Sequence, residues 1–230
     1  MKRKGCFMEE KVFTPLPDQA GVPQSMNEAM KLRDELAKKV FDEAVGNPTG
    51  KERIIGDLHF HGHSIMHSSP RRFTSVEQMN SFMIQEWNSV TDDEDTVIVN
   101  GDFIDFDNCT KEEGYAIIDQ LKGRIILILG NHDRPYAGWY RGYGSRLTVI
   151  DYPILKDEFW IISHEPKFVS IASPYANVFA HVHLNPMYKD VSPRSFCTSA
   201  ERIGYKPILW SFVKEAVMCC SRKENTDESN

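Results

Sequence analysis

Side chains that can bind metal ions or transfer protons follow directly after several apolar segments of this chain. The run Ile125–Leu129 is typical of a strand buried on both faces, and Gly130-Asn131-His132-Asp133 comes straight after it. Gly130 would let the backbone turn sharply at the end of this strand. Because the carboxyl ends of parallel strands meet at one edge of a sheet, this placement predicts a chemical site there. The alternative is a simple Asn-His turn without a chemical role.

Four further strand ends carry the same kinds of side chain. Residues i and i+2 of a strand point the same way, so an Asp-x-His or a His-x-His pair can chelate an ion. Carboxylate, imidazole and amide ligands together suit Mn, Fe, Zn or Co ions. Seven candidate ligands are too many for one tetrahedral ion and enough for two, and Asp102, in the middle strand, is then the natural bridging carboxylate. The four strand ends are Asp57-Leu58-His59, Gly101-Asp102 with Asp105, His164, and His181-Val182-His183.

The order of these motifs resembles that of the calcineurin-like metallophosphoesterase superfamily: D-x-H, G-D-x-x-D, G-N-H-D, one His after a strand, then H-x-H. The resemblance covers about residues 53–210 and is strongest for a branch of compact, single-domain bacterial and phage phosphoesterases. Three stretches outside the motifs are also similar to that branch, namely Arg71–Asn80, Trp87-Asn88 with Val90, and Glu201 with Tyr205-Lys206-Pro207.

The resemblance implies an enzyme with two divalent metal ions, for which manganese is favoured. One ion would be held by Asp57, His59, Asp102 and His183, and the other by Asp102, Asn131, His164 and His181. A hydroxide bridging the two ions would attack phosphorus. His132 would be the catalytic imidazole that protonates the leaving oxygen, with Asp105 as its carboxylate partner. Asp133 is expected to hold its loop rather than to bind metal.

Contacts to a substrate are less sharply indicated. His63, Arg72 and Arg134 are the candidates, because an arginine can bind phosphate through two parallel hydrogen bonds. Each of them could equally be an ordinary loop or surface residue, and the same holds for Arg71. The aromatic segment 136–143 could stack on a base or a sugar, or it could serve only as packing.

The chain departs from the family pattern at a few positions. Ser163 and Ala180 stand where glycine is usual, and Asp133 stands where many members have glutamate. The segment 60–63, which contains His61, is one residue longer than is usual in the branch. We expect little effect from the two small residues.

Three functions are compatible with these motifs. The first is a phosphodiesterase that acts on a nucleotide or another small diester. The alternative is a phosphomonoesterase or a protein phosphatase. A binding module that keeps the fold without catalysis would have lost metal ligands or the catalytic histidine, and none is missing here.

Strands and helices alternate up to residue 130, after which strands dominate. Strands are predicted at 53–56, 96–99 and 124–129, with helices at 74–90, behind a Thr74 capping box, and at 111–122. Residues 134–146 show neither period and are predicted to form a loop. Further strands are predicted near 147–150, 152–155, 159–163, 177–180, 195–199 and 207–213. The pattern predicts an α/β fold in which two β-sheets form a sandwich flanked by helices, in αββα layers.

Composition sets the remaining limits. The 230 residues carry a formal net charge of -6, which argues against bulk binding of nucleic acid. No apolar run reaches the roughly 18 residues of a membrane helix. Five cysteines without metal-ligand spacing predict a reduced, cytoplasmic protein, and Cys219-Cys220 is given no role. Three regions are predicted: an extension over 1–50 with one helix packed on the domain, a domain over 51–215, and a polar, disordered tail over 216–230.

Overall fold

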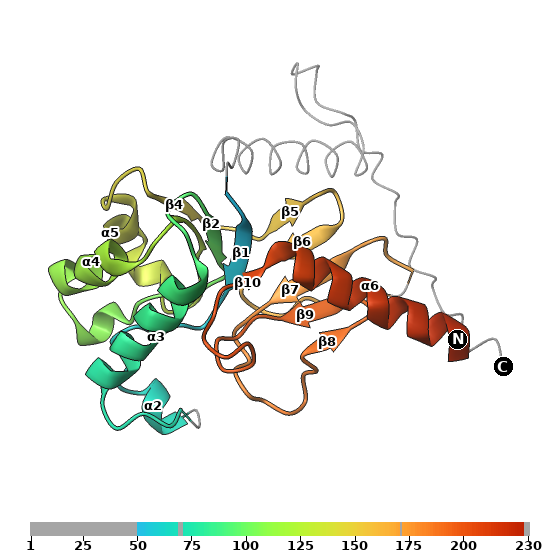
Figure 1. Ribbon diagram of the computed structural model, residues 1–230, viewed down its shortest axis with the longest axis horizontal. Coiled ribbons are helices and arrows are strands. Elements are labelled where there is room, and N and C mark those ends of the chain that lie inside the picture. Colours follow the sequence, from blue (N-terminus) through green and yellow to red (C-terminus); the bar gives the residue numbers. More distant parts are fainter. Residues whose placement is uncertain (1–49, 69–70, 171, 228–230) are drawn as a thin grey trace, which may run out of the picture.

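The computed structural model describes residues 50–68, 71–170 and 172–227 (Figure 1). Two five-stranded sheets form a sandwich flanked by helices, which confirms the predicted fold class. The predicted N-terminal extension and its helix lie outside the described residues, apart from Gly50. No helix in the described part of the chain is both long enough and apolar enough to span a membrane.

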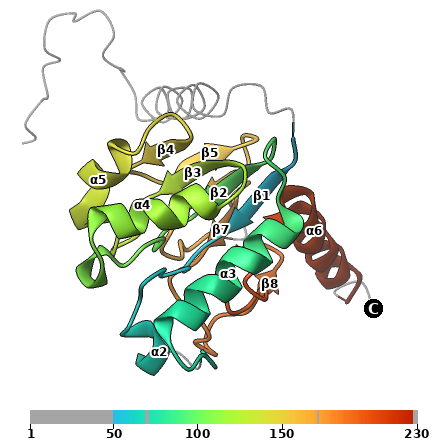
Figure 2. The ribbon, with the colours of Figure 1, turned by 60° about the vertical axis from the view of Figure 1, so that its left-hand side comes forward.

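The first sheet carries most of the predicted strand-end motifs. Its order is β10-β1-β2-β3-β4, in which β1 to β4 are parallel and β10 pairs antiparallel with β1. The strands are β1 (Glu52–Ile55), β2 (Thr96–Val99), β3 (Arg124–Ile128), β4 (Leu147–Ile150) and β10 (Ile208–Leu209). The helices that connect them are α2 (Ile65–Ser68), α3 (Val76–Val90), α4 (Lys111–Gln120) and α5 (Ala137–Arg141), and Figure 2 shows α3, α4 and α5 together on one side of the molecule.

The second sheet has the order β5-β6-β7-β9-β8. Its three central strands are parallel, and the two edge strands pair antiparallel with their neighbours. The strands are β5 (Ile154–Lys156), β6 (Trp160–Ile162), β7 (Ala176–Phe179), β8 (Val191–Ser192) and β9 (Ser195–Cys197).

The first sheet is buried on both faces because its apolar side chains alternate between two cores. In β3, Ile125 and Leu127 face the core that α3 and α4 cover, whereas Ile126 and Ile128 face the second sheet. The same alternation places Ile55 and Ile54 of β1 in the two different cores. Continuous apolar strands are the expected sequence of a parallel sheet that is covered on both sides.

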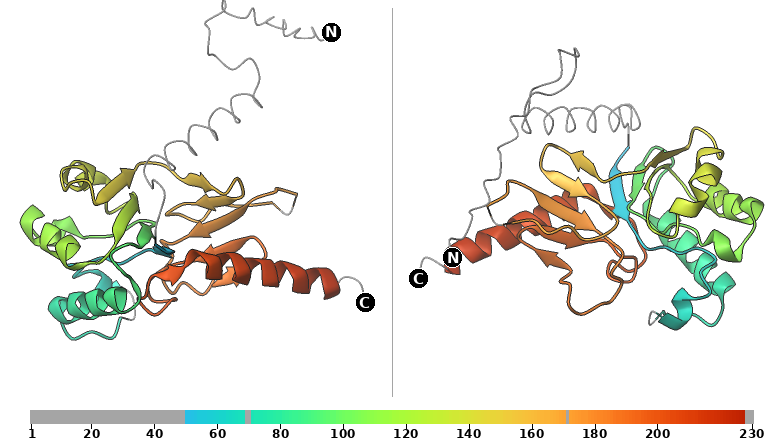
Figure 3. Two further views of the ribbon diagram at one scale, coloured as in Figure 1. Left: turned by 45° about the horizontal axis from the view of Figure 1, so that its top comes forward. Right: turned by 180° about the vertical axis from the view of Figure 1, so that it is seen from behind.

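Two predicted segments have a different structure. Of the strand predicted over 207–213, only β10 forms, and helix α6 (Trp210–Asp227) follows it through the polar tail predicted from 216. This helix packs Trp210, Val213 and Val217 into the core between the sheets. Their spacing of three and four residues is that of an apolar helix face, which the strand prediction did not take into account. Figure 3 shows α6 away from α3 and α4, beside the second sheet.

Segment 134–146 is also more regular than predicted. It contains a 3₁₀ turn, Arg134–Tyr136, followed by α5. At α3 the N-cap is Ser75, which accepts a hydrogen bond from the N–H of Gln78, rather than the predicted Thr74. The predicted cap of α4 is correct, because Thr110 and Glu113 form a complete capping box.

The carboxyl ends of the two sheets are joined directly. The Gly56 N–H donates to the carbonyl of Thr198 (2.9 Å), and the Ala200 N–H donates to the carbonyl of Gly56 (2.9 Å). These bonds link the end of β1 to the end of β9. Strand-end residues of both sheets are therefore held against one another.

Candidate metal centre

Strained backbone marks the strand ends that carry the predicted ligands. A positive φ costs a residue other than glycine roughly 1–3 kcal/mol, and such residues gather at functional sites. Five of the seven predicted ligands adopt this conformation: Asp57 (55°), His59 (49°), Asp102 (52°), His181 (72°) and His183 (47°). The surrounding contacts therefore hold these side chains in place against a local conformational preference.

Two glycines let the strand ends approach closely. Gly101 has a φ of 99°, and a Cβ placed on it would lie 2.1 Å from Nδ1 of His164. Gly130 is not in the left-handed region, so the expected sharp turn is not why a glycine stands there. A Cβ on Gly130 would lie 2.2 Å from Oδ1 of Asp102, and the close approach of these two segments is what requires glycine.

The first group of converging ligand atoms comes from Asp57, His59 and His183, whose atoms lie within 4.8 Å of one another. Asp57 Oδ2 and His59 Nε2 are buried and have no hydrogen-bond partner. His59 Nε2 lies 3.5 Å from Asp102 Oδ2. Burying such polar atoms unpaired is costly, and a cation between them would satisfy both. The donor set therefore fits a divalent metal ion.

The second group consists of Asp102, His164 and His181. His164 Nε2 lies 3.2 Å from Asp102 Oδ2, 2.9 Å from Asn131 Oδ1 and 3.1 Å from His181 Nδ1. Four of the predicted ligands thus meet around one point. Asp102 stands near His59 on one side and near His164 on the other, which is the position that a bridging carboxylate would need.

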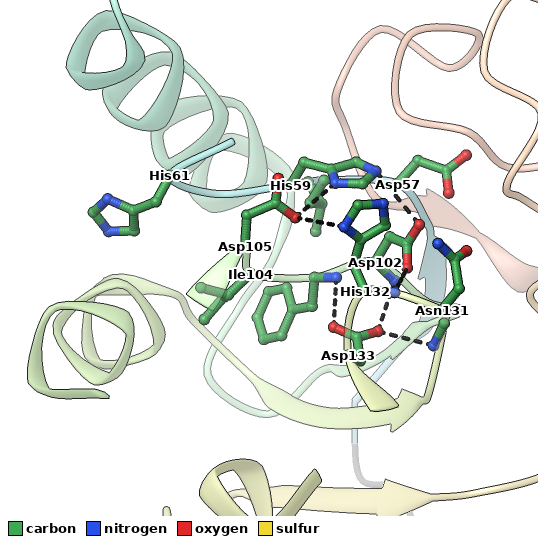
Figure 4. Close-up of polar contacts among 12 residues, drawn as sticks. Asp57, His59, His61, Asp102, Ile104, Asp105, Asn131, His132 and Asp133 are labelled. Carbon is green, nitrogen blue, oxygen red and sulfur yellow. Dashed lines mark hydrogen bonds and ion pairs between the residues drawn. The ribbon is translucent and has the colours of Figure 1, made fainter. Parts of the chain in front are cut away.

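A third group contains His59, Asp102 and His132. The His132 N–H donates to Asp102 Oδ1 (3.0 Å), and its ring meets that of His59 edge to face at 4.9 Å (Figure 4). The His132 side chain is 40% exposed, whereas His59 and Asp102 are buried. His132 therefore lies at the open side of the cluster, where a substrate can reach it.

Asp105 is hydrogen-bonded to His59 and lies farther from the expected partner, His132. Its Oδ1 accepts a hydrogen bond from His59 Nδ1 at 2.9 Å. The distance from the same oxygen to His132 Nδ1 is 3.6 Å, which is too long for a hydrogen bond. The expected hydrogen bond to His132 is thus not formed in this structure, although the two side chains lie within ion-pair distance, and the pairing of Asp105 with His132 stays a prediction. Asp105 orients His59 and adds negative charge near His132.

The imidazole rings are oriented by acceptors behind them. His59 Nδ1 faces Asp105, His164 Nδ1 faces the carbonyl of Asn100 (3.0 Å), and His183 Nδ1 faces Glu201 Oε1 (3.0 Å). Each acceptor favours the tautomer with its proton on Nδ1, which leaves Nε2 as the ligand atom. His181 is reversed, since its Nδ1 faces the cluster.

Charges within the cluster are strongly coupled. Burial alone would raise the pKa of Asp102, but the hydrogen bond with His164 and the nearby imidazoles lower the pKa of this carboxyl well below its usual value. Burial opposes protonation of His164, yet Asp102 and Asp57 raise the pKa of His164 to about 9. In the same way, Asp105 outweighs burial and raises the pKa of His59. The carboxylates thus attract positive charge to this site.

Asp133 is fully buried behind the cluster. Its carboxylate accepts hydrogen bonds from the N–H groups of Asp102 (2.7 Å), Phe103 (3.0 Å) and Gly130 (2.9 Å), and from the hydroxyl of Tyr140 (2.7 Å). Figure 4 shows this carboxylate below the cluster. The prediction that Asp133 holds the loop is confirmed.

The three predicted substrate contacts are exposed side chains. Arg134 Nη1 donates to the carbonyl of Asp151 (3.3 Å) at the end of β4. Within the described residues, neither His63 nor Arg72 forms a hydrogen bond or ion pair with the cluster. His61 points away from the cluster (Figure 4) and is hydrogen-bonded to Asn80 in α3. These substrate contacts stay predictions.

Arg71 is buried and so cannot serve as a phosphate clamp at the surface. The aromatic segment 136–143 mainly packs against the domain.

The ring of Phe106 contacts those of Tyr136, Trp139 and Tyr140, with ring centres 5.0–5.4 Å apart. The sequence analysis assigned no role to Glu201. The one feature that pointed to it was its place in a stretch similar to the family branch. Ala180 fits in place of the usual glycine because Gly56 lies opposite it.

One family model and several known proteins are similar to this chain. Residues 53–208 match the family model described as calcineurin-like phosphoesterase. The uncharacterized protein MJ1445 of Methanocaldococcus jannaschii is 31% identical over 168 residues, which cover 71% of this chain and 89% of that protein. The crystal structure of a protein of unknown function from Aquifex aeolicus, AQ665, is similar with a TM-score of 0.54 and 25% identity, covering 72% of this chain and 98% of that one. A nuclease of Pseudomonas putida, MPE, aligns with a TM-score of 0.35 and 20% identity over 57% of this chain and 60% of its own. Because this family model matches more than half of the chain, the chain belongs to the calcineurin-like phosphoesterase family.

Proposed function

We propose that this chain is a two-metal phosphodiesterase that hydrolyses a nucleotide or another small diester. Membership of the family supports a metal-dependent hydrolase of phosphoric esters. The observation that carries the proposal is the position of Asp102, whose carboxylate lies within 3.5 Å of His59 on one side and within 3.2 Å of His164 on the other.

The donor atoms fit two ions of the borderline divalent class, and manganese is the one we favour. The first ion would be held by Asp57, His59, Asp102 and His183, and the second by Asp102, Asn131, His164 and His181. When bound, such ions withdraw charge from phosphate oxygens and lower the pKa of coordinated water.

His132 is the residue we assign to proton transfer. Its backbone bond to Asp102 fixes the imidazole beside the candidate ligands, and its exposed ring can reach a bound ester. Asp105 Oδ1 lies 3.6 Å from His132 Nδ1 and places negative charge beside the ring. Nε2 would donate a proton to the leaving oxygen, because an unprotonated alkoxide is a poor leaving group.

Charge favours a diester over a monoester. Two divalent ions would bring four positive charges and a protonated His132 a fifth, whereas Asp57, Asp102, Asp105 and the attacking hydroxide would return four. A diester monoanion neutralises the remaining charge, whereas a monoester dianion exceeds it. Among the described residues, the ion pairs of these three carboxylates are all with histidines, so no arginine or lysine neutralises them.

The test compares two chromogenic esters with the manganese-loaded protein. Hydrolysis of bis-p-nitrophenyl phosphate should exceed that of p-nitrophenyl phosphate, and chelator should abolish both activities. His132→Ala should lose activity while keeping its metal, which separates catalysis from metal binding. A preference for the monoester would replace the diesterase proposal with a phosphatase. Inactivity on both esters and on a panel of nucleotide di- and monoesters would refute an esterase.

A cytoplasmic location is part of the same proposal. It is supported by the cysteines of the described residues, Cys109, Cys197, Cys219 and Cys220, none of which forms a disulfide.

A further inference from the structure

Glu201 is a buried carboxylate directly behind one of the candidate metal ligands. It lies on the turn after β9, and its side chain is only 3% exposed. Its Oε1 lies 3.0 Å from His183 Nδ1 and 2.8 Å from Nε of Arg71. One carboxylate oxygen therefore links an imidazole to a guanidinium in the interior of the protein.

Arg71 connects this carboxylate to the first sheet. Its Nη1 donates to the carbonyl of Leu58 (2.7 Å) and its Nη2 to the carbonyl of Asp57 (2.5 Å). The guanidinium also lies 5.6 Å from the ring centre of Tyr205. Because the Arg71 side chain is fully buried, its donors are committed to these partners and not to a ligand. The result is a chain of contacts from Asp57 through Arg71 and Glu201 to His183.

This chain of contacts reaches one ligand group and not the other. Asp57, His59 and His183 make up the first group, and Arg71 and Glu201 contact the backbone or side chain of two of them. In the second group, His164 is backed by a neutral backbone carbonyl, that of Asn100. A carboxylate behind an imidazole fixes its tautomer and makes it a stronger metal ligand than a neutral acceptor does.

We propose that Glu201, held in place by Arg71, is a positioning residue that selectively strengthens metal binding at the Asp57, His59 and His183 group. The inference rests on the proposed two-metal site and adds that its two halves are tuned separately. Glu201 acts through His183 and does not touch the substrate.

Glu201→Gln tests this role, because the amide has the same shape without the charge. Manganese affinities are measured by titration against a chelating indicator, and the two ions are distinguished by the visible absorption of the cobalt-loaded protein. The affinity for one of the two ions should fall about 10- to 100-fold, and the affinity for the other should not change. Thermal unfolding of the metal-free variants shows whether the fold is kept.

Two further variants assign the effect to one half of the site. In a His181→Ala background, Glu201→Gln should weaken the ion that is left. In a His183→Ala background, it should have no further effect, because the side chain through which it acts is gone. Glu86→Gln is the matched control, since Glu86 forms an ion pair of 2.9 Å with Lys206 away from the ligands, and we expect both metal affinities to be unchanged.

The outcomes separate the two proposals. A wild-type protein that binds two ions, with a folded Glu201→Gln variant that binds both as tightly, would overturn the role of Glu201 alone. Equal weakening of both ions would also overturn it, since the effect would not be selective. A wild-type protein that binds fewer than two ions would refute the two-metal proposal and this inference with it. If Glu201→Gln fails to fold, Arg71→Lys, which keeps the charge and loses the forked contacts, must show the same selective loss.

Discussion

The carboxylate of Asp133 accepts a hydrogen bond of 2.7 Å from the backbone N–H of Asp102, 31 residues earlier in the chain. This bond fixes the end of β2 against the loop that follows β3. Asp102 in turn accepts a bond of 3.0 Å from the N–H of His132, so the two loops hold each other. The strained backbone of Asp102 is stabilised by a residue that does not itself face the candidate metal site.

Asp133→Ala should destabilise the metal-free protein by about 3 kcal/mol. Burial and the nearby Asp102 carboxylate raise the pKa of Asp133, which means that its buried charge is itself destabilising. Removing it, however, leaves three backbone N–H groups without their acceptor, at roughly 1–3 kcal/mol for each buried group. Urea unfolding measures the change. A loss below about 1 kcal/mol would show that these donors find water instead.

Gly130→Ala should disrupt the site, because the added Cβ would lie 2.2 Å from Oδ1 and 2.6 Å from N of Asp102. We expect a loss of stability of a few kcal/mol together with weaker metal binding. Gly138→Ala is the matched control, since nothing lies within 4 Å of its added Cβ and alanine favours helix α5 by up to about 1 kcal/mol. Equal behaviour of the two variants would contradict the close packing at Gly130.

Asp105→Asn should weaken metal binding as well as turnover. The Asp105 hydrogen bond is to His59, a candidate ligand, and not to His132. His132→Ala should instead lower kcat about 10²- to 10⁴-fold with metal content unchanged. Metal analysis and steady-state kinetics on both variants distinguish these effects. Normal metal affinity in Asp105→Asn would contradict a role of Asp105 at His59 and would leave only its role beside His132.

The stability of the domain should depend on pH through Asp95, which lies at the opposite end of β1 from the metal site. Burial would raise its pKa, but the hydrogen bonds from Arg53 (2.9 Å) and from the N–H of Lys51 (2.7 Å) lower the pKa of Asp95. A lowered pKa means that this stabilisation is present above the unfolded value of 3.8 and is lost as pH falls through the folded value.

Asp95→Asn should therefore cost about 1–3 kcal/mol at pH 7, and less as the pH falls below 3.8. The measurement is urea unfolding of both proteins across this range. A difference between them that does not change with pH would mean that the charge of Asp95 contributes nothing.

Sequence patterns were sufficient where one local signal decides the structure. The buried strand before Gly130 and the capping box at Thr110 are such cases, and both are correct. The partner of Asp105 could not be predicted, because the choice between His59 and His132 depends on differences of less than 1 Å between loops from different strands. Glu201 was missed for the same reason, since its meeting with His183 and Arg71 arises only when the two sheets pack.

Helix α6 shows another limit. Its first turn follows β10 without a break, and an apolar start such as Ile208-Leu209-Trp210 suits a strand and a buried helix equally. Tertiary packing of Val213 and Val217 between the sheets decides in favour of the helix.

The most direct test of the account is anomalous diffraction at the manganese absorption edge, from crystals of the protein grown with manganese. The account predicts two peaks per chain, about 3.5–4 Å apart, with the Asp102 carboxylate between them. One peak should lie against Asp57, His59 and His183, and the other against Asn131, His164 and His181. No peak at Asp102, or a single peak that leaves either group of side chains without a metal, would contradict it.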